Sequence, residues 1–265
     1  MSHLTDQAYL RTEQYRDASN LNARTSIHQR FSTNDYNWQH WVFDHLDLPA
    51  RSWLLDVGCG PADLWLENED RISSGWTILL SDFSPGMVQK ARHNLRNSSH
   101  PFEYWILDAQ AIPFPDNSLD ALIANHMFYH VPDRDAALHE FHRVLRSDGY
   151  LYAATNGCGH LQELRDLVSR FYPDAKTANV AENFGLENGS TQLSHHFSDV
   201  TCHRQKNSLV VTEAEPVIAY GLSMMCQTAR REHAEAFSCL IHEKIATQGA
   251  IHVRKDAGMF VARKA

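Results

Sequence analysis

The sequence has no long apolar run and no excess of positive charge. No segment reaches the roughly 18 consecutive apolar residues of a membrane-spanning helix, and the N-terminus lacks the charged and apolar stretches of a signal peptide. The formal net charge is -8 over 265 residues, and the 24 lysines and arginines are scattered along the chain. We therefore expect no membrane insertion, no secretion and no nucleic-acid partner.

Paired cysteines are also lacking. The five cysteines lie far apart without CxxC spacing: Cys59, Cys158, Cys202, Cys226 and Cys239. This pattern argues against a disulfide framework and against a zinc ribbon, and it suits reduced thiols, so we expect a cytoplasmic protein. With 43% hydrophobic and 21% charged residues, the chain has enough apolar side chains for a substantial core.

The hydrophobic pattern changes near residue 48. Before it, the chain is polar with isolated apolar anchors such as Tyr9, Tyr15 and Trp38, which predicts amphipathic helices. After it, short apolar runs alternate with helical patterns, and the predicted strands include WLLDV, WTILLSD, FEYWILD, LDALIAN and GYLYAAT. Strands separated by helices indicate βαβ units, and therefore an α/β fold with a parallel sheet covered on both faces.

Local signals define several element ends. Ser84 and Asp133 are candidate N-caps of two helices. Thr212 and Glu215 have the spacing of a capping box, which predicts a helix start at that point. We further expect a strand near residues 195–204 and a last strand over GMFVARK.

The stretch LLDVGCGPADLW, residues 54–65, leads from an apolar strand into a glycine-rich turn. Such a turn lets backbone N–H groups approach a ligand, because glycine has no Cβ to block them. Asp82 and Asp108 end the next two predicted strands, so both carboxylates should lie at the same edge of the sheet as the turn. A carboxylate after the second strand can accept both ribose hydroxyls of a nucleotide. Taken singly, each feature also fits an ordinary tight turn or a turn-capping aspartate.

Two phosphate-binding signatures are missing. The dinucleotide fingerprint ends in glycine or alanine where this chain has Asp63, whose charge would lie near a pyrophosphate. The phosphate-loop pattern with its lysine is absent as well. A nucleoside cofactor without phosphates therefore fits the turn better.

Four segments in residues 53–155 carry a family resemblance: LLDVGCGPA, LLSDFSPGMVQKAR, LDAQAIPFPDNSLDALIANHMFYHVPD and EFHRVLRSDGYLYAAT. In this order and spacing the chain resembles the class I S-adenosylmethionine-dependent methyltransferases, in the broad group that includes menaquinone and ubiquinone C-methyltransferases. The resemblance implies a Rossmann-like, doubly wound, seven-stranded and mostly parallel sheet with an antiparallel edge strand. It also implies S-adenosyl-L-methionine as cofactor and S-adenosyl-L-homocysteine as product.

The resemblance suggests a division of the chain into a lid and a cofactor-binding domain. We expect residues 1–48 to form an N-terminal helical lid and residues 49–265 to form the methyltransferase domain. A helical insertion over about residues 156–194 would add to the lid. These additions could enclose a small organic substrate at the catalytic edge.

The resemblance also implies cofactor-binding residues. Asp82 would bind the ribose, and the methionine part of the cofactor would be surrounded by Asp56, Gly58, Cys59 and Gly60. Family members commonly have a third glycine where this chain has Ala62, which keeps a small residue in the turn.

The adenine and the sulfonium would be held by the segments that follow. By the same resemblance, Phe83 and Met87 would pack against the adenine, Asp108 would accept its exocyclic amine, and the backbone N–H of Ala109 would reach the ring. Asn125 would lie beside the sulfonium at the end of the fourth strand.

Catalytic candidates are fewer. Methyl transfer from a sulfonium is an in-line displacement that alignment and exclusion of water can accelerate, so a base is needed only if the acceptor carries a proton. His126, Tyr129 and His130 in NHMFYH are the candidates for that base, although His130 could instead shape the loop.

The 17 histidines also raise the question of a metal site. His139 and His142 are three residues apart on a predicted helix, whereas His195 and His196 are adjacent. Adjacent residues of a strand point to opposite faces and do not easily chelate one ion. We predict no metal.

Three functions remain open from the sequence. The first is a methyltransferase that acts on a small organic molecule, the second a protein or peptide methyltransferase, and the third a non-methylating S-adenosylmethionine-binding protein of the same fold. A DNA amino-methyltransferase is disfavoured, because Asn125-His126-Met127-Phe128 stands where that family has [DNS]-P-P-[YF]. The acceptor atom and the oligomeric state are left open.

Overall fold

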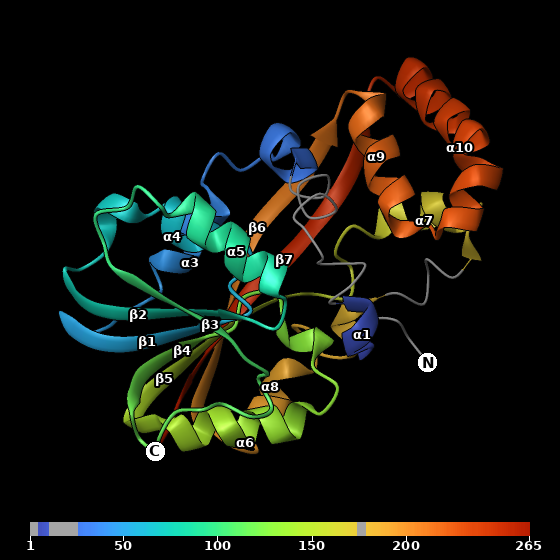
Figure 1. The fold of residues 1–265 in the computed structure, drawn as a ribbon. Helices are drawn as coiled ribbons and strands as arrows, with labels where there is room; N and C mark the ends of the chain where they lie inside the picture. Colours follow the sequence, from blue (N-terminus) through green and yellow to red (C-terminus); the bar gives the residue numbers. More distant parts are fainter. Residues whose placement is uncertain (1–4, 11–25, 174–178) are drawn as a thin grey trace.

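The computed structural model describes residues 5–10, 26–173 and 179–265. Seven strands form one sheet in the order β3-β2-β1-β4-β5-β7-β6 (Figure 1). They are β1 (Arg51–Val57), β2 (Gly75–Asp82), β3 (Phe102–Ile106), β4 (Leu119–Ile123), β5 (Leu145–Asn156), β6 (Ser198–Val211) and β7 (Ile251–Arg263). The first five strands in this order pair in parallel, whereas β7 runs antiparallel to both β5 and the edge strand β6. The predicted α/β fold with a seven-stranded, mostly parallel sheet is confirmed.

Alternating side chains of the strands enter two cores, one on each face of the sheet. Leu54 of β1 lies in one core and Leu55, its neighbour, lies in the other. The first face is covered by α3 (Trp38–Phe43), α4 (Asp63–Leu66) and α5 (Pro85–Asn94), and the second by α6 (Arg134–Val144) and α8 (Gly189–Leu193) (Figure 1). The sheet is therefore doubly wound, which leaves its carboxyl edge for a ligand.

Strands β6 and β7 run on past the carboxyl end of β5, where they carry a third core (Figure 1). This core is formed with α7 (Gln162–Ser169), α9 (Ala214–Met224) and α10 (Gln227–Gln248). Ile27 and Phe31 enter it from the helical residues 26–31, and Ser32 forms a β-bridge with Leu209 of β6. In the described part of the chain, no helix is long and apolar enough to cross a membrane.

The division into a lid and a cofactor-binding domain stays a prediction. Of the expected N-terminal lid, residues 5–10 and 26–48 are described, and they include α1 (Gln7–Tyr9) and α3. Tyr15 lies outside the described residues. The expected insertion contains α7, η6 (Val180–Glu182) and α8.

The structure confirms both predicted N-caps. The Ser84 hydroxyl accepts the backbone N–H of Met87 at 3.4 Å, and the Asp133 carboxylate accepts that of Ala136 at 3.0 Å. These bonds fix the starts of α5 and α6, which are the helices that follow β2 and precede β5.

The structure tests two expectations near residues 195–215. The strand expected near residues 195–204 is present, with the bounds Ser198–Val211, because pairing with β7 keeps the chain extended through Val211. The expected capping box is wrong: the N-cap of α9 is Glu213 without a side-chain cap bond, so Thr212 and Glu215 form no such box.

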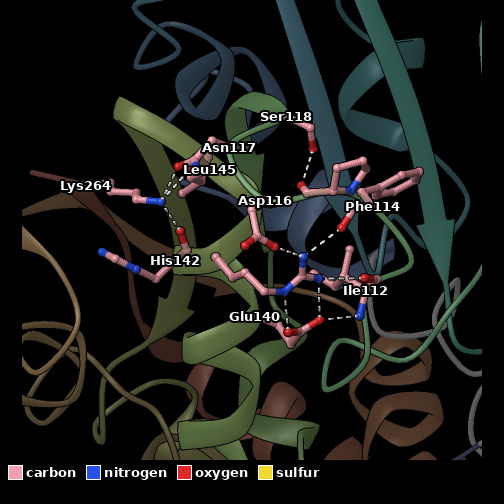
Figure 2. A network of polar contacts seen from close by, with 11 residues as sticks. Ile112, Phe114, Asp116, Asn117, Ser118, Glu140, His142, Leu145 and Lys264 are labelled. Carbon is pink, nitrogen blue, oxygen red and sulfur yellow. Dashed lines mark hydrogen bonds and ion pairs between the residues drawn. The ribbon is translucent and has the colours of Figure 1, made fainter.

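A charged network fastens the loop after β3 to α6 (Figure 2). Arg143 donates to the carbonyl oxygens of Ile112 and Phe114, each at 2.8 Å, and pairs with Asp116 and Glu140. The Glu140 carboxylate in turn accepts the Ile112 N–H at 2.8 Å. Hydrogen bonding to Arg143 lowers the pKa of Glu140. The network thereby holds residues 112–116, which lie in the same loop as the predicted adenine contacts.

Candidate active site

The glycine turn after β1 adopts left-handed backbone angles. Gly58 and Gly60 have φ angles of 70° and 56°, and Ala62 follows at 68°. A Cβ on Gly58 would lie 2.6 Å from the Cβ of Met127, whereas nothing lies within 4 Å of one on Gly60. Gly58 therefore serves close packing, and Gly60 borders open space. The φ angle of Ala62 gives a physical reason for the glycine that is common at this position in the family that the sequence resembles.

The Asp82 carboxylate joins this turn to the start of α5. Its two oxygens accept the backbone N–H groups of Gly60 at 3.1 Å and of Ser84 at 2.8 Å. Burial raises the pKa of Asp82 to about 6, although both N–H groups favour the ionised form. The predicted ribose ligand thus lies at the carboxyl end of β2, against the glycine turn.

Asp56 is a second buried carboxylate at this edge. It is 2% exposed, and its Oδ2 accepts the indole N–H of Trp65 at 2.8 Å. Its Oδ1 is buried and has no hydrogen-bond partner among the described residues. Burial raises the pKa of Asp56 to about 7, against the effect of the Trp65 hydrogen bond, and the negative charge of Asp82 raises it further. A cationic or hydroxyl donor from a ligand would supply the missing bond.

Asn125 offers a similar acceptor one strand away. It follows β4, and its Oδ1 is also buried without a partner in the described part of the chain. The register between β1 and β4 pairs Asp56 with Ile123, so Asn125 lies two residues further toward the carboxyl edge. The two unsatisfied oxygens therefore belong to neighbouring strands at the same edge.

The other predicted cofactor residues differ in burial. Phe83 and Cys59 are half-buried, whereas Met87 and Ala109 are 1% and 5% exposed. Burial raises the pKa of the Cys59 thiol well above its usual range, and the charges of the two nearby aspartates add to this. Met87 points from α5 into the interior, so an adenine contact would be made with its buried face.

Asp108 lies after β3 and has two kinds of partner. Its Oδ1 accepts the backbone N–H of Gln110 at 3.0 Å, which is the turn-capping role that the sequence left open. Its Oδ2 accepts the side-chain amide of Gln7, from α1, at 2.9 Å. An amine bound to Asp108 would share this carboxylate with the N-terminal segment. Sequence reasoning missed Gln7, because no motif links it to a position 101 residues away.

The three catalytic candidates fall into two environments. His126 has a φ of 51°, donates its backbone N–H to Ala154 at 2.9 Å, and has its ring centroid 5.3 Å from that of Trp38. Tyr129 and His130 belong to η4 (Phe128–His130), where their ring centroids are 4.6 Å apart. Tyr129 is 7% exposed and packs in the core beneath α6.

Burial and the charge of Lys255 lower the pKa of His126 to about 4. Its imidazole is therefore neutral at pH 7 and has a nitrogen that can accept a proton.

Three further residues near His126 were missed from the sequence: His28, His160 and Lys255. The pKa of His28 is lowered to about 3, first by burial and then by Lys255 and His126. The pKa of His160 falls well below its usual value by burial and by the same neighbouring positive groups. These residues are far apart in the chain and belong to no motif, so no sequence signal pointed to them.

The described residues bear on the metal-site prediction and form a hollow at the start of α6. Among those residues, no three His, Cys, Asp or Glu side chains are grouped so that they could hold a metal ion. A hollow of about 470 Å³ lies at the start of α6 and contains none of the predicted site residues. Its lining residues are Pro132, Asp133, Arg134, Asp135, Leu138, Gln192 and His195.

The doubly wound sheet, the left-handed glycine turn and the buried carboxylate after β2 define a nucleoside-binding α/β protein. Residues 55–153 match the family described as a methyltransferase domain. These residues, which are fewer than half of the chain, are therefore similar to methyltransferase domains.

Among curated proteins, the chain is similar to the ubiquinone/menaquinone biosynthesis C-methyltransferase UbiE of Xanthomonas axonopodis pv. citri. The two are 31% identical over 114 residues, which are 42% of this chain and 45% of that protein. The chain thus spans about half the length of the curated relative.

Solved structures share the fold at lower sequence identity. Phosphoethanolamine N-methyltransferase 2 of Haemonchus contortus, in complex with S-adenosylhomocysteine, has a TM-score of 0.59 at 16% identity. The match covers 98% of this chain and 60% of that enzyme's chain. The [4+2]-cyclase SpnF has a TM-score of 0.57 at 20% identity, and the match covers 97% of this chain and 94% of the SpnF chain.

Proposed function

We propose that the chain transfers the methyl group of S-adenosylmethionine to a small organic molecule. The observation that carries this proposal is the pair of buried, unsatisfied oxygens, Asp56 Oδ1 and Asn125 Oδ1, at the ends of β1 and β4. The cofactor's methionine part has an ammonium group that could complete the hydrogen bonding of Asp56. Its sulfonium would be stabilised by the dipole of the Asn125 amide. A nucleotide phosphate would instead be repelled by the Asp56 and Asp82 carboxylates.

The remaining cofactor contacts follow from the edge of the sheet. Asp82 would accept the ribose hydroxyls while it keeps its bonds to Gly60 and Ser84, since each carboxylate oxygen has more than one lone pair. Asp108 would accept the adenine amine, with Phe83 against the ring. When bound, the cofactor supplies an electrophilic methyl group, and the residues of the chain align it and exclude water.

His126 is the best placed proton acceptor. It follows Asn125 directly, and its imidazole is neutral at pH 7 because burial and Lys255 lower its pKa. A base with so low a pKa is weak, so it would contribute most when the acceptor loses its proton late, as methyl transfer proceeds. Tyr129 and His130 stay candidates for the same role.

Cofactor binding is tested by calorimetric titration of the protein with S-adenosylmethionine and with NAD. We expect S-adenosylmethionine alone to bind, and Asp82→Ala to weaken it about 100-fold, because hydrogen bonds to a charged group contribute roughly 1.5–3 kcal/mol each. Asp70→Ala removes an exposed carboxylate from η3 (Glu69–Arg71) and is the matched control. Equal affinity in the Asp82 variant would refute the ribose contact, and binding of NAD alone would refute the cofactor.

Methyl transfer is tested with labelled S-adenosylmethionine in a metabolite extract and in a protein lysate of the source organism. Label in a small molecule supports the proposal. Label in protein bands instead favours a protein or peptide acceptor. If the cofactor binds and no label moves, the chain is a non-methylating binding protein, and the proposal is wrong.

A further inference from the structure

A group of basic side chains lies beside His126 at the carboxyl edge of the sheet. Lys255 is on β7 opposite Asn207 of β6, beyond the end of β5, whose Asn156 pairs with Ala257. Its neighbour Asp256 donates its backbone N–H to His160, in the turn after β5, and the His160 ring lies 5.9 Å from that of His28, centroid to centroid. The charge of Lys255 adds to burial in lowering the pKa of His28, His126 and His160. Residues from four segments thus lie close to one another at this edge.

The cations of this group form no ion pair with a carboxylate of the described residues. In residues 5–10, 26–173 and 179–265, no carboxylate oxygen lies within 4.0 Å of the half-buried Lys255 ammonium nitrogen. Arg165, which also acts on His160, is 8% exposed and donates only to neutral oxygens, those of Cys158, His160 and Gln162.

The nearest acid along the strand is turned away from Lys255. Asp256 is the next residue of β7, so its side chain points to the opposite face of the strand. Its carboxylate pairs there with Arg204 at 3.5 Å. Among the described residues Lys255 therefore has no anion within ion-pair distance, whereas the charges of Asp166 and Glu163 act on Arg165. A half-buried cation in this condition carries a desolvation cost that an anionic ligand would offset.

The imidazoles of His160 and His28 can form hydrogen bonds with a ligand beside Lys255. His160 Nδ1 accepts the backbone N–H of Asp256 at 3.2 Å, so its neutral ring carries its proton on Nε2, as a donor. The ring of His28 lies 5.9 Å from that of His160, centroid to centroid. His28 Nδ1 is buried and has no partner among the described residues. These rings form no metal cluster with described neighbours, and a nearby ammonium group opposes metal binding.

We propose that Lys255, His160 and His28 form an anion subsite that holds an acidic group, a carboxylate or a phosphate, of the methyl acceptor. This inference rests on the proposed function, because it names the substrate class of the same site. The acid pairs with Lys255 and accepts from Nε2 of His160. In this proposal the acceptor extends from the subsite toward Asn125, which His126 follows directly in the chain. A bound anion also raises the pKa of His126, which makes it a stronger base.

Binding of inorganic phosphate and of acetate to the protein loaded with S-adenosylhomocysteine tests the subsite. We expect one of the two anions to bind the wild type in calorimetry, and the one that binds identifies the acidic group. Lys255→Met is expected to weaken that anion at least tenfold, while Lys255→Arg retains it. The affinity for S-adenosylhomocysteine is expected to stay within twofold. Lys206→Met removes an exposed lysine from β6 and should change neither affinity.

The melting temperature of Lys255→Met distinguishes a loss of anion binding from a loss of structure. Because Lys255→Met removes a cation that has no ion-pair partner among the described residues, the melting temperature without ligand should stay equal or rise, so lost anion binding is not lost structure. If neither anion binds at tens of millimolar, the inference is wrong. It is equally wrong if Lys255→Met weakens S-adenosylhomocysteine as much as the anion, since the lysine then serves the cofactor carboxylate.

The charge of the methylated product gives an independent test. The labelled product formed in a metabolite extract should be retained by an anion exchanger at pH 8, and its formation should fall at least tenfold in kcat/KM with Lys255→Met. A neutral or cationic product refutes the subsite while the proposed function stands. Failure of the wild type to bind S-adenosylhomocysteine at all refutes the proposed function instead.

Discussion

Replacing Asp56 by asparagine should change how the stability of the protein depends on pH. The folded carboxyl group has its pKa raised to about 7 by burial, whereas an unfolded aspartate ionises near 3.8. Between these values the folded state holds a proton that the unfolded state has lost, so the wild type loses stability as the pH rises through this window. From pH 5 to pH 8.5 this loss amounts to about 2.7 kcal/mol, from 1.36 kcal/mol per pKa unit.

The variant has no such loss from this position. The substituted residue lies within β1 and serves neither as a helix cap nor in a turn, and the amide oxygen of Asp56→Asn can still accept the Trp65 indole N–H. The new amide N–H can lack a partner, but its cost in stability is the same at each pH. This cost therefore cancels when the stability difference between the variant and the wild type at one pH is subtracted from that at another. With roughly 2–4 °C per kcal/mol for a chain of this size, the difference in melting temperature should move by about 5–10 °C in favour of the variant.

Thermal denaturation of both proteins without cofactor, followed by circular dichroism from pH 5 to pH 8.5, measures this change. A difference in melting temperature that is constant with pH would refute the raised pKa. Titration with S-adenosylmethionine at pH 8 adds a second readout, because the variant should bind the cofactor ammonium at least tenfold more weakly if Asp56 Oδ1 is its partner.

Two further predictions concern the turn and the loop that frame the edge. Gly58→Ala should destabilise the protein by about 2–4 kcal/mol in thermal denaturation, because the new Cβ would meet Met127 and the φ angle is positive. Gly60→Ala should cost only about 1–2 kcal/mol, from backbone strain alone. Equal losses in the two variants would contradict the packing role of Gly58. Arg143→Ala should lower the free energy of unfolding in urea by about 1–2 kcal/mol, a modest loss because the Arg143 side chain is partly exposed. The same variant should speed hydrogen exchange at the Ile112 amide. Unchanged exchange would show that the network does not hold the loop.

Much of the fold could be predicted because its signals are local. The helix starts at Ser84 and Asp133 follow from residue type and position, and the parallel sheet follows from the alternation of strand and helix patterns. The end of β6 could not be predicted in this way, because its pairing with β7 keeps the chain extended through Val211, beyond the expected strand. Roles of individual site residues in cofactor binding and catalysis stay predictions.

The sequence by itself determined which edge of the sheet carries the candidate site. Asp56 and Asp82 lie at the carboxyl ends of β1 and β2, the glycine turn follows β1, and the topology of a parallel sheet brings these strand ends to one side. Only the tertiary structure decided what faces this edge: His160 contacts the backbone of Asp256, next to Lys255, because β7 runs past β5 and the chain folds back over it. That Lys255 has no counter-ion among the described residues depends on which carboxylates surround it in space, and no linear pattern records that.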